Sequence, residues 1–415
     1  DWAWDEGKEA SAPITLNGGQ AYDLKVEYFE NSGSARAHLS WWWPGLVKDE
    51  PVPPGALSAP GASCNAPEPL PAPARTTEFY RNDFEAEDPT CWATKPSSGC
   101  NGVKVYERSP GGGSGIVAIA TGERRRSGQK ALRLAFGLNE DEGGGTFNPN
   151  ATHVFYRHYD YYEENFDFAG GMKIARFSGH DSTTGLNQYN SILVARAQKT
   201  ATNDYCDTNP MGTMYLQRND SNNGTTYGGQ FPNVSFPRGQ WISVETEMKL
   251  NTPGGSDGEV RVYVDGQKKI EATGLNYVRD AGDSLPINGV LMGGWYSNVA
   301  GNIAGCFNPD PLSRRYIDDV IISNRYVGPE PTVTRGSSCT EQVITFTTPL
   351  PGTTQVEYGL TAGYGSSTPV NATQTTAHSQ TLSGLLSGKG YHYRVKSTWS
   401  NGYQYVSPDY TFVAK

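Results

Sequence analysis

The sequence predicts an all-β protein made of two-layer sandwiches of antiparallel strands. The chain of 415 residues is rich in turn formers, with 49 Gly and 27 Pro, and in aromatic residues that favour strands, with 24 Tyr and 9 Trp. It contains no long stretch with the apolar spacing of a helix. Many short strands separated by tight turns account for this composition better than helices do.

Residues 241–250 are the clearest strand, because their side chains alternate between two faces. Ile242, Val244, Met248 and Leu250 form an apolar face, and Ser243, Glu245, Glu247 and Lys249 form a polar one. This period of two predicts a half-buried strand, and we expect its polar face to be exposed to solvent. Residues 251–258 are turn formers, and Asp265-Gly266 is a hairpin signal at the end of the next strand.

The length predicts two or three domains. Residues 1–58 are an all-β segment, and residues 59–75 form a linker rich in Pro and Ala. A central domain over residues 76–329 ends at a Pro-Glu-Pro sequence, and residues 330–415 form a smaller sandwich.

The charge excludes some partners. A net charge of −9 argues against nucleic acid, which needs a basic surface. No apolar run is long enough to span a membrane as a helix. The arginines at 124–126 lie among Gly and Ser residues, which predicts a solvated turn. A site for an anionic ligand must therefore be a local cluster of Lys and Arg.

The six cysteines predict disulfides and not a metal centre. None of them forms a CxxC pair, and an even number in a turn-rich chain favours an oxidising compartment. We expect Cys91 to pair with Cys100, and Cys206 to pair with Cys306. Five glycosylation sequons, at Asn150, Asn219, Asn223, Asn233 and Asn371, agree with a secreted, extracellular glycoprotein.

Both flanking segments carry the motifs of known modules. Residues 14–45 resemble the C-terminal part of a protective-antigen-type carbohydrate-binding domain, so we expect more chain before residue 1. Residues 353–367 and 378–415, with the alternation Tyr391-x-Tyr393-x-Val395, resemble a fibronectin type III module. Such modules space or orient their neighbours, and both allow assembly with other extracellular protein domains.

The central domain resembles the concanavalin-like jelly-roll polysaccharide lyases of the alginate and glucuronan lyase type. Residues 153–179, 241–267 and 316–323 carry the resemblance, which covers most of residues 78–328. It implies a jelly-roll β-sandwich and a secreted enzyme. That enzyme would cleave an acidic, uronate-containing polysaccharide by β-elimination, with no metal or cofactor required.

The resemblance also implies a catalytic set. Alginate-lyase-like members carry Lys on one strand, Ser-x-Arg on the next and Tyr-x-Tyr on a third. Lys173, Arg196 and Tyr215 match this pattern, whereas Val194 replaces the Ser and Gln217 replaces the second Tyr. Tyr215 would be the base and the acid, and Lys173, Arg196 and Gln217 would neutralise the substrate carboxylate.

Two further groups are candidates for substrate binding. His153, Arg157 and Tyr159 alternate on one strand, where a His base with an Arg neutraliser is chemically plausible. Trp295 and Tyr296 lie on a late strand that could cross the concave face, where an aromatic ring would stack on a sugar.

A second hypothesis is a non-catalytic protein, either glycan-binding or an extracellular structural or adhesive protein, on a lyase-like scaffold. The acidic net charge and the departures at Val194 and Gln217 favour it, while Lys173, Arg196 and Tyr215 favour the lyase. The lyase hypothesis requires those last three residues to converge in one open groove.

Overall fold

A computed structural model describes a protein built almost entirely of strands. The described residues are 40–41, 50–51, 68, 70–71, 73, 77–94, 100–108, 116–136, 141–164, 166, 172–180, 187–195, 211–219, 231–278, 285–296 and 313–415. Within these ranges the one helix is α1 (Pro89–Thr94). The all-β prediction is confirmed. Apart from β1 (Ser40–Trp41) and β2 (Glu50–Pro51), residues 1–58 and their predicted resemblance lie outside the described residues.

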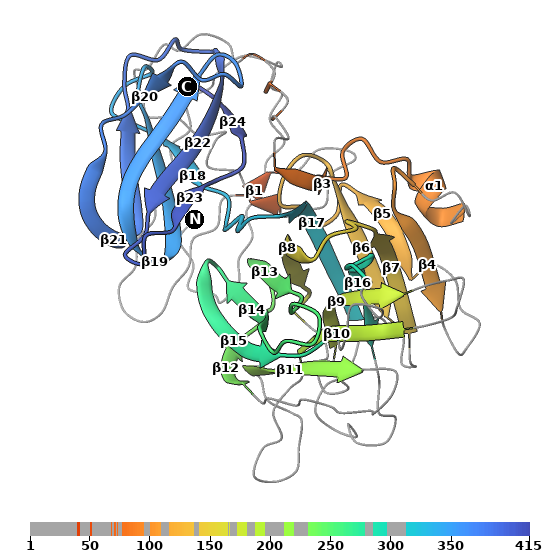
Figure 1. Cartoon of the computed structure of the whole chain (residues 1–415). Coiled ribbons are helices and arrows are strands. Elements are labelled where there is room, and N and C mark those ends of the chain that lie inside the picture. The colour runs from red at the N-terminus through yellow and green to blue at the C-terminus, as the bar shows by residue number, and fades with distance from the viewer. Residues whose placement is uncertain are drawn as a thin grey trace, which may run out of the picture.

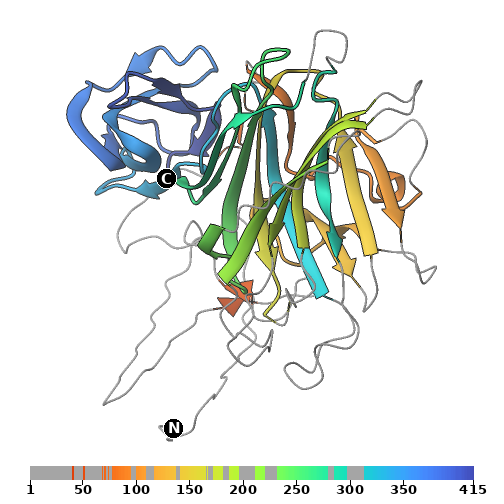
Figure 2. The same cartoon turned by 60° about the horizontal axis from the view of Figure 1, so that its bottom comes forward.

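The central part is a sandwich of two antiparallel sheets (Figures 1 and 2). The front sheet has the order β12 (Phe231–Ser235), β11 (Met211–Asn219), β10 (Asn187–Ala195), β9 (Met172–His180), β16 (Gly289–Tyr296), β7 (Asp141–Phe147) and β4 (Lys104–Arg108). The back sheet has the order β15 (Gln267–Leu275), β14 (Gly258–Val264), β13 (Trp241–Lys249), β8 (His153–Tyr162), β17 (Ser313–Ser323), β6 (Lys130–Phe136) and β5 (Val117–Thr121), and β3 (Glu78–Asn82) also pairs with β17. Late strands lie beside early ones, since β16 pairs with β7 and β17 with β8. This is a jelly-roll sandwich, as the sequence predicted.

Apolar side chains from both sheets meet in one core. Ile174 and Phe177 from β9 and Val154 and Ile317 from the back sheet are all buried in it. Residues 241–250 contribute the apolar face that the alternation predicted. Burial of this kind, at about 25 cal/mol per Å² of apolar surface, is what holds the two sheets together.

The opposite face of β13 differs from the prediction. Glu245 and Glu247 are 1% and 5% exposed, whereas the sequence predicted a face in water. The C-terminal strands cover this side of the back sheet, and a period of two along one strand carries no information about which neighbour will cover a face.

The C-terminal part is a second, smaller β-sandwich (Figure 1). Its strands are β18 (Thr332–Arg335), β19 (Gln342–Gly359), β20 (Ser366–Ser367), β21 (Asn371–Leu382), β22 (Gly390–Thr398), β23 (Gln404–Val406) and β24 (Tyr410–Val413). The long β19 pairs with β18 and β21 through its first half and with β20 and β22 through its second half. One strand therefore belongs to both layers.

The two sandwiches share a hydrophobic cluster. Phe155, Tyr263 and Tyr326 of the central part pack in the same buried cluster as Tyr405 and Trp399 of the C-terminal part. The interface is therefore continuous with the hydrophobic core of the C-terminal sandwich.

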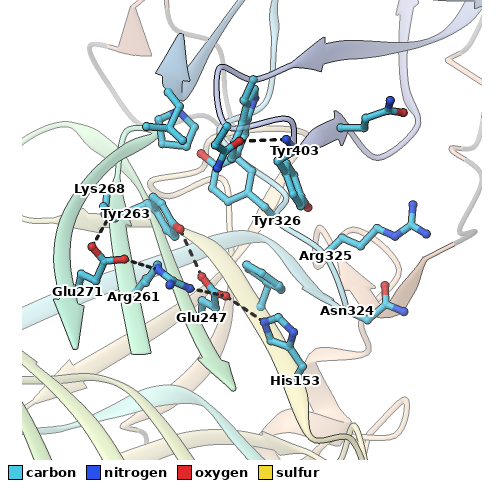
Figure 3. A pocket seen from close by; sticks show the side chains of 16 residues that line it. His153, Glu247, Arg261, Tyr263, Lys268, Glu271, Asn324, Arg325, Tyr326 and Tyr403 are labelled. Carbon is cyan, nitrogen blue, oxygen red and sulfur yellow. Dashed lines mark hydrogen bonds and ion pairs between the residues drawn. The ribbon is translucent and has the colours of Figure 1, made fainter. Parts of the chain in front are cut away.

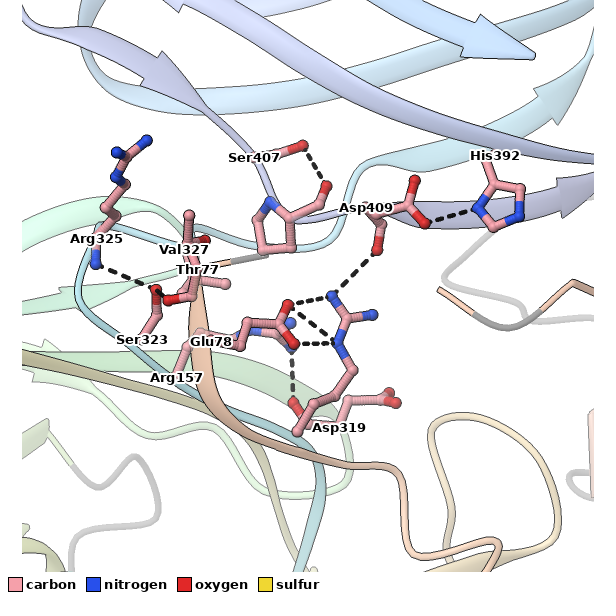
Figure 4. A network of polar contacts seen from close by, with 12 residues as sticks. Thr77, Glu78, Arg157, Asp319, Ser323, Arg325, Val327, His392, Ser407 and Asp409 are labelled. Atoms are coloured by element: carbon pink, nitrogen blue, oxygen red, sulfur yellow. Dashed lines mark hydrogen bonds and ion pairs between the residues drawn. The ribbon is translucent and has the colours of Figure 1, made fainter. Parts of the chain in front are cut away.

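The connecting segment is fixed by hydrogen bonds on both sides. The Glu245 carboxyl oxygens accept bonds from the backbone N–H groups of Val327 and Gly328, both at 2.7 Å. The Tyr405 hydroxyl donates to the Val327 carbonyl at 2.7 Å. A further link is made by Arg81 of β3, which pairs with Glu78 and donates to the Asp409 carbonyl at 3.1 Å. Figure 4 shows Glu78 and Asp409 in this polar network.

Part of the predicted linker also lies against the C-terminal sandwich. The backbone N–H of Glu68 donates to the Gly388 carbonyl at 2.7 Å, and its side chain pairs with Lys389. Around this point the segment is therefore held by contacts, which a composition rich in Pro and Ala did not predict.

The predicted disulfide between Cys91 and Cys100 is confirmed, with a Cα–Cα distance of 5.9 Å. It fixes α1, whose Trp92 is fully buried and donates from Nε1 to Glu87 at 2.6 Å. Cys339 is also disulfide-bonded. The predicted pair of Cys206 and Cys306 lies outside them as well.

Candidate active site

Three neighbouring strands of the front sheet bring two of the predicted catalytic residues into one row. Lys173 of β9 pairs with Val194 of β10, and Val194 pairs with Tyr215 of β11. Directly paired residues of antiparallel strands lie on the same face of a sheet. Lys173 and Tyr215 therefore share a face, with Cα atoms about 10 Å apart across two strand spacings.

A second row runs beside the first. Gln217 pairs with Ile192, and Ile192 pairs with Arg176 of β9. Gln217 is therefore on the face of Tyr215, as the sequence predicted, and Arg176 joins the set. Arg176 and Lys173 are both half-buried, while Ile174 and Ala175 between them lie in the core.

A β-bulge explains why Arg176 was missed. The pairing of β9 with β10 shifts between Leu193 and Val194, where Lys173 takes the place expected of residue 174. Strict alternation from Lys173 would have placed Arg176 on the core face, but the extra residue returns it to the outer face. The signal in the sequence is the polar–apolar–apolar–polar run of residues 173–176.

The register separates the two aromatic candidates of β16. Trp295 pairs with Lys173, which places it on the outer face beside the row of Lys173, Val194 and Tyr215. Tyr296 pairs with Met172, whose side chain is buried in the core. The sequence assigned both residues to substrate binding, but the pairing brings only Trp295 to the face of Lys173.

A buried charged network lies directly behind this row, between the two sheets. Arg315 of β17 is fully buried and donates from Nε to Asp160 at 2.8 Å and from Nη1 to the Gly293 carbonyl at 2.6 Å. Its Nη2 donates to the Ile174 carbonyl at 3.3 Å. Ile174 follows Lys173 on β9, and Gly293 lies two residues before Trp295 on β16. Arg315 therefore ties together the two strands that carry them.

The charges of this network stabilise the ionised forms of Arg315 and Asp160. Burial by itself would raise the pKa of Asp160, but the Arg315 guanidinium and His158 outweigh it, and the pKa of Asp160 is lowered. Burial lowers the pKa of His158, so this imidazole is neutral near pH 7. The network is an ionised Arg–Asp pair with a neutral His beside it.

The second predicted group lies on the other sheet. Arg157 and Tyr159 belong to β8 of the back sheet and are covered by the C-terminal sandwich. Arg157 is 1% exposed and donates to the Asp319 carbonyl at 2.9 Å, and the Tyr159 hydroxyl accepts a bond from the Glu330 backbone N–H at 2.7 Å. They share one face of β8, as the alternation predicted, but that face is filled by protein. The structure does not bring either residue to the face of Lys173.

Arg126 belongs to the same buried contact. It pairs with Asp319 and Glu330, both at 2.5 Å, and lies over the Tyr159 ring at 3.7 Å from its centroid. The sequence predicted a solvated turn for residues 124–126, and for Arg126 this was wrong. Arg126 instead links the central domain to the segment that enters the C-terminal sandwich.

His153, at the start of β8, reaches a different surface. Its Nε2 lies 3.0 Å from Glu247, and it lines a pocket between the two sandwiches. It is therefore on the sheet opposite Lys173, and it does not belong to the row of Lys173, Val194 and Tyr215. Arg196 and its side chain lie outside the described residues, one position beyond the end of β10.

The described ranges hold no cluster of three or more His, Cys, Asp or Glu that could bind a metal ion. Within the same ranges, no helix has the length and apolar character needed to cross a membrane.

A family model matches the middle of the chain. Residues 136–297 match polysaccharide lyase 14, a range that includes β9, β10, β11 and β16. No curated protein matches the chain.

Solved structures of similar fold include several lyases. An endo-β-1,4-glucuronan lyase from the fungus Trichoderma reesei has 13% identity and a TM-score of 0.41, over 60% of this chain and 97% of that one. A PL-14 alginate lyase from Aplysia kurodai has 16% identity and a TM-score of 0.38, over 52% and 89%. The alginate lyase vAL-1 from Chlorella virus has 16% identity and a TM-score of 0.37, over 59% and 100%. Similarities this distant carry no argument about the reaction. The family match and the two-sheet topology together give the central domain a polysaccharide-lyase-type fold, and a polysaccharide lyase is a candidate function for it.

Proposed function

We propose that the central domain is a lyase that cleaves a uronate-containing polysaccharide by β-elimination. The observation that carries the proposal is the row formed by Lys173, Val194 and Tyr215 on adjacent strands. It gives a base candidate and a cation on one face, two strands apart. A sugar ring lying across β10 would contact both.

The reaction needs few groups. Tyr215, as a phenolate, would take the proton from C5 of the uronate, and the electron pair would move into the adjacent carboxylate. The C4–O bond would then break, and the Tyr215 hydroxyl would return the proton to the departing oxygen. The product would be one chain with a new reducing end and another with an unsaturated uronate. Because a tyrosine has an ordinary pKa of about 10, a nearby cation is needed to lower it.

The developing charge on the carboxylate is the main barrier that the site has to lower. Lys173 and Arg176 of β9 are two cations on the proposed face, and Gln217 would add an amide donor. Arg176 would join Lys173, Arg196 and Gln217, to which the sequence assigned this role, so neutralisation would rest on a larger set of donors. This compensates for Val194 at the position where the related lyases carry a hydroxyl.

The test is the ultraviolet absorbance of the unsaturated uronate, measured on alginate, polyglucuronate and ulvan with the whole chain and with Tyr215→Phe. We expect absorbance to rise with one of these polymers and to stay flat with the variant, because Phe cannot exchange a proton. Tyr358→Phe, in the C-terminal sandwich, is the matched control and should retain full activity.

If no polymer gives a rise, or if Tyr215→Phe retains the activity, the proposal fails. Glycan binding without any elimination would instead support the non-catalytic alternative, which the exchanges at Val194 and Gln217 favour.

A further inference from the structure

A pocket of about 630 Å³ lies between the two sandwiches, on the side of the molecule away from Lys173. The central domain contributes residues from β8, β13, β14 and β15 and from the segment after β17, and the C-terminal sandwich contributes residues from β19 and from the loop before β23. We propose that this pocket is a second saccharide site that binds a uronate unit, with its ring on Tyr403 and its carboxylate on Arg325.

The aromatic wall is built by the loop between β22 and β23. The backbone N–H of Trp399 donates to the Tyr403 carbonyl at 2.8 Å, and the N–H of Gly402 donates to the Trp399 carbonyl at 2.8 Å. Gly402 has a φ of +84°, which closes the turn without strain. The Tyr403 ring packs on Trp399 with centroids 4.7 Å apart and is still 39% exposed. A ring held in this way offers a preformed apolar face to a sugar.

Side chains that can donate hydrogen bonds to a ligand lie next to this ring. Figure 3 shows Tyr403, Arg325 and Asn324 along one side of the pocket. Arg325 and Asn324 are exposed, and neither side chain has an ion pair or hydrogen bond with any residue that the structure describes. A guanidinium can bind a carboxylate through two parallel hydrogen bonds, and an amide can bind neighbouring hydroxyl groups.

The opposite side of the pocket is already neutralised. Arg261 pairs with Glu247 at 3.1 Å and with Glu271 at 2.7 Å, and Lys268 pairs with Glu271 at 2.6 Å. The residues that line the pocket include three cations, Arg261, Lys268 and Arg325, but only two carboxylates, which both lie on this opposite side. In a chain with a net charge of −9, this excess of positive charge at Arg325 favours an acidic sugar over a neutral one.

The size and position of the pocket also fit a saccharide. Ligand sites typically have volumes of about 300–1,000 Å³ and often lie at domain interfaces. The pocket exists only while the C-terminal sandwich is docked, so it would give that sandwich a role in holding the polymer. The inference does not require the front sheet to be catalytic.

Calorimetric titration of the whole chain with saturated hexasaccharides of glucuronate and of alginate tests the inference, with cellohexaose as the neutral comparison. All proteins carry Tyr215→Phe so that no sugar is consumed. We expect a uronate hexasaccharide to bind, and both Tyr403→Ala and Arg325→Ala to weaken this binding by roughly tenfold or more. Phe79→Ala is the matched control, because Phe79 is 37% exposed and lies outside the pocket. Thermal unfolding of each variant confirms that it is folded.

The two proposals fail in different ways. Binding that survives Tyr403→Ala and Arg325→Ala but is lost in Lys173→Ala overturns the second site and leaves the front sheet as the binding surface. Binding that is lost in the two pocket variants, in a chain that cleaves no uronate polymer, supports the second site without the lyase. Equal affinity for cellohexaose and the uronates would overturn the assignment of Arg325 to a carboxylate.

Discussion

The Arg315 guanidinium lies between the two sheets, where water cannot compensate for a lost partner. We expect Arg315→Met to lower the free energy of unfolding by about 3–5 kcal/mol, because it leaves the Asp160 charge buried and unpaired. Urea denaturation measures this change. The double variant Arg315→Met/Asp160→Leu removes both charges and should recover most of the loss. A single variant within about 1 kcal/mol of the native chain would show that Asp160 does not depend on Arg315.

Arg176 gives the sharpest kinetic prediction at the scale of a residue. If it stabilises the developing charge, Arg176→Ala should lower kcat by a factor of about 10² or more on the uronate polymer, with a smaller change in KM. Arg133→Ala, on β6 of the back sheet, is the control and should leave both constants unchanged. A rise in KM alone would instead assign Arg176 to ground-state binding.

The residue scale also shows where sequence reasoning reached its limit. Lys173 and Tyr215 could be found because the family motif fixes them and the register then aligned them. Arg176 could not, because a bulge of one residue changes the face of every later side chain on β9. The alternation correctly predicted that Arg157 and Tyr159 share a face of β8, but a single strand does not predict the domain that covers that face.

At the scale of elements, glycines allow β7 and β16 to approach closely beside the row of Lys173, Val194 and Tyr215. A Cβ atom on Gly293 would lie 2.3 Å from the Gly143 carbonyl oxygen, and one on Gly144 would lie 2.4 Å from the Met292 carbonyl oxygen. These contacts are with backbone atoms, which cannot move aside without separating the strands.

Gly293→Ala should therefore destabilise the chain by about 1–3 kcal/mol and also lower the lyase activity, because Gly293 accepts the Arg315 bond and precedes Trp295. Thermal unfolding and the absorbance assay check the two effects. Gly363→Ala, where the nearest atom would be 3.6 Å away, is the matched control. If Gly293→Ala is as stable as Gly363→Ala, the close approach of β7 and β16 does not depend on a glycine at position 293.

The sequence predicted individual strands and turns better than it predicted which parts of the chain cover them. Residues 241–250 form β13 with the predicted apolar face, and the hairpin at Asp265-Gly266 is present between β14 and β15. Short-range patterns fix such features, because they depend on residues that are neighbours in the chain. The burial of Glu245 depends on Val327 and Gly328, whose backbone N–H groups bind its side chain from about 80 residues later in the chain, and no local pattern encodes it.

At the scale of the whole molecule, buried carboxyl groups set the dependence of stability on pH. Burial raises the pKa of Glu245 to about 8, and burial together with Asp319 raises the pKa of Asp318 to about 8. Both groups hold a proton in the folded chain at a pH where the unfolded chain has lost it. Their contribution to the free energy of unfolding is therefore complete below their ordinary pKa values of 4.5 and 3.8. It is lost as the pH rises toward about 8.

We expect the free energy of unfolding to fall by a few kcal/mol between pH 4.5 and about 8. At acidic pH the dependence has the opposite sign, and the free energy of unfolding falls as the pH falls. The pKa of Asp160 is lowered, so its contribution is lost as the pH falls below 3.8 and through the folded value. Unfolding midpoints across this range should peak under mildly acidic conditions.

Glu245→Gln should flatten the fall on the alkaline side, since an amide does not titrate. The exposed Glu164→Gln is the control and should keep the native slope. A midpoint that rises steadily from pH 5 to 8 in the native chain would contradict the prediction.

The shared cluster around Phe155, Tyr263 and Tyr326 has a hydrodynamic consequence. Because it joins the two sandwiches and the connecting segment is bonded on both sides, we expect them to rotate through solution as one particle with a single correlation time. A polymer bound at the interdomain pocket would therefore stay at a fixed distance and angle from the front sheet. After a cut in the chain between Gly328 and Pro331, that distance and angle would no longer be fixed. If the two sandwiches then separated, each would expose its apolar side chains of the shared cluster, and these surfaces would promote association with other molecules.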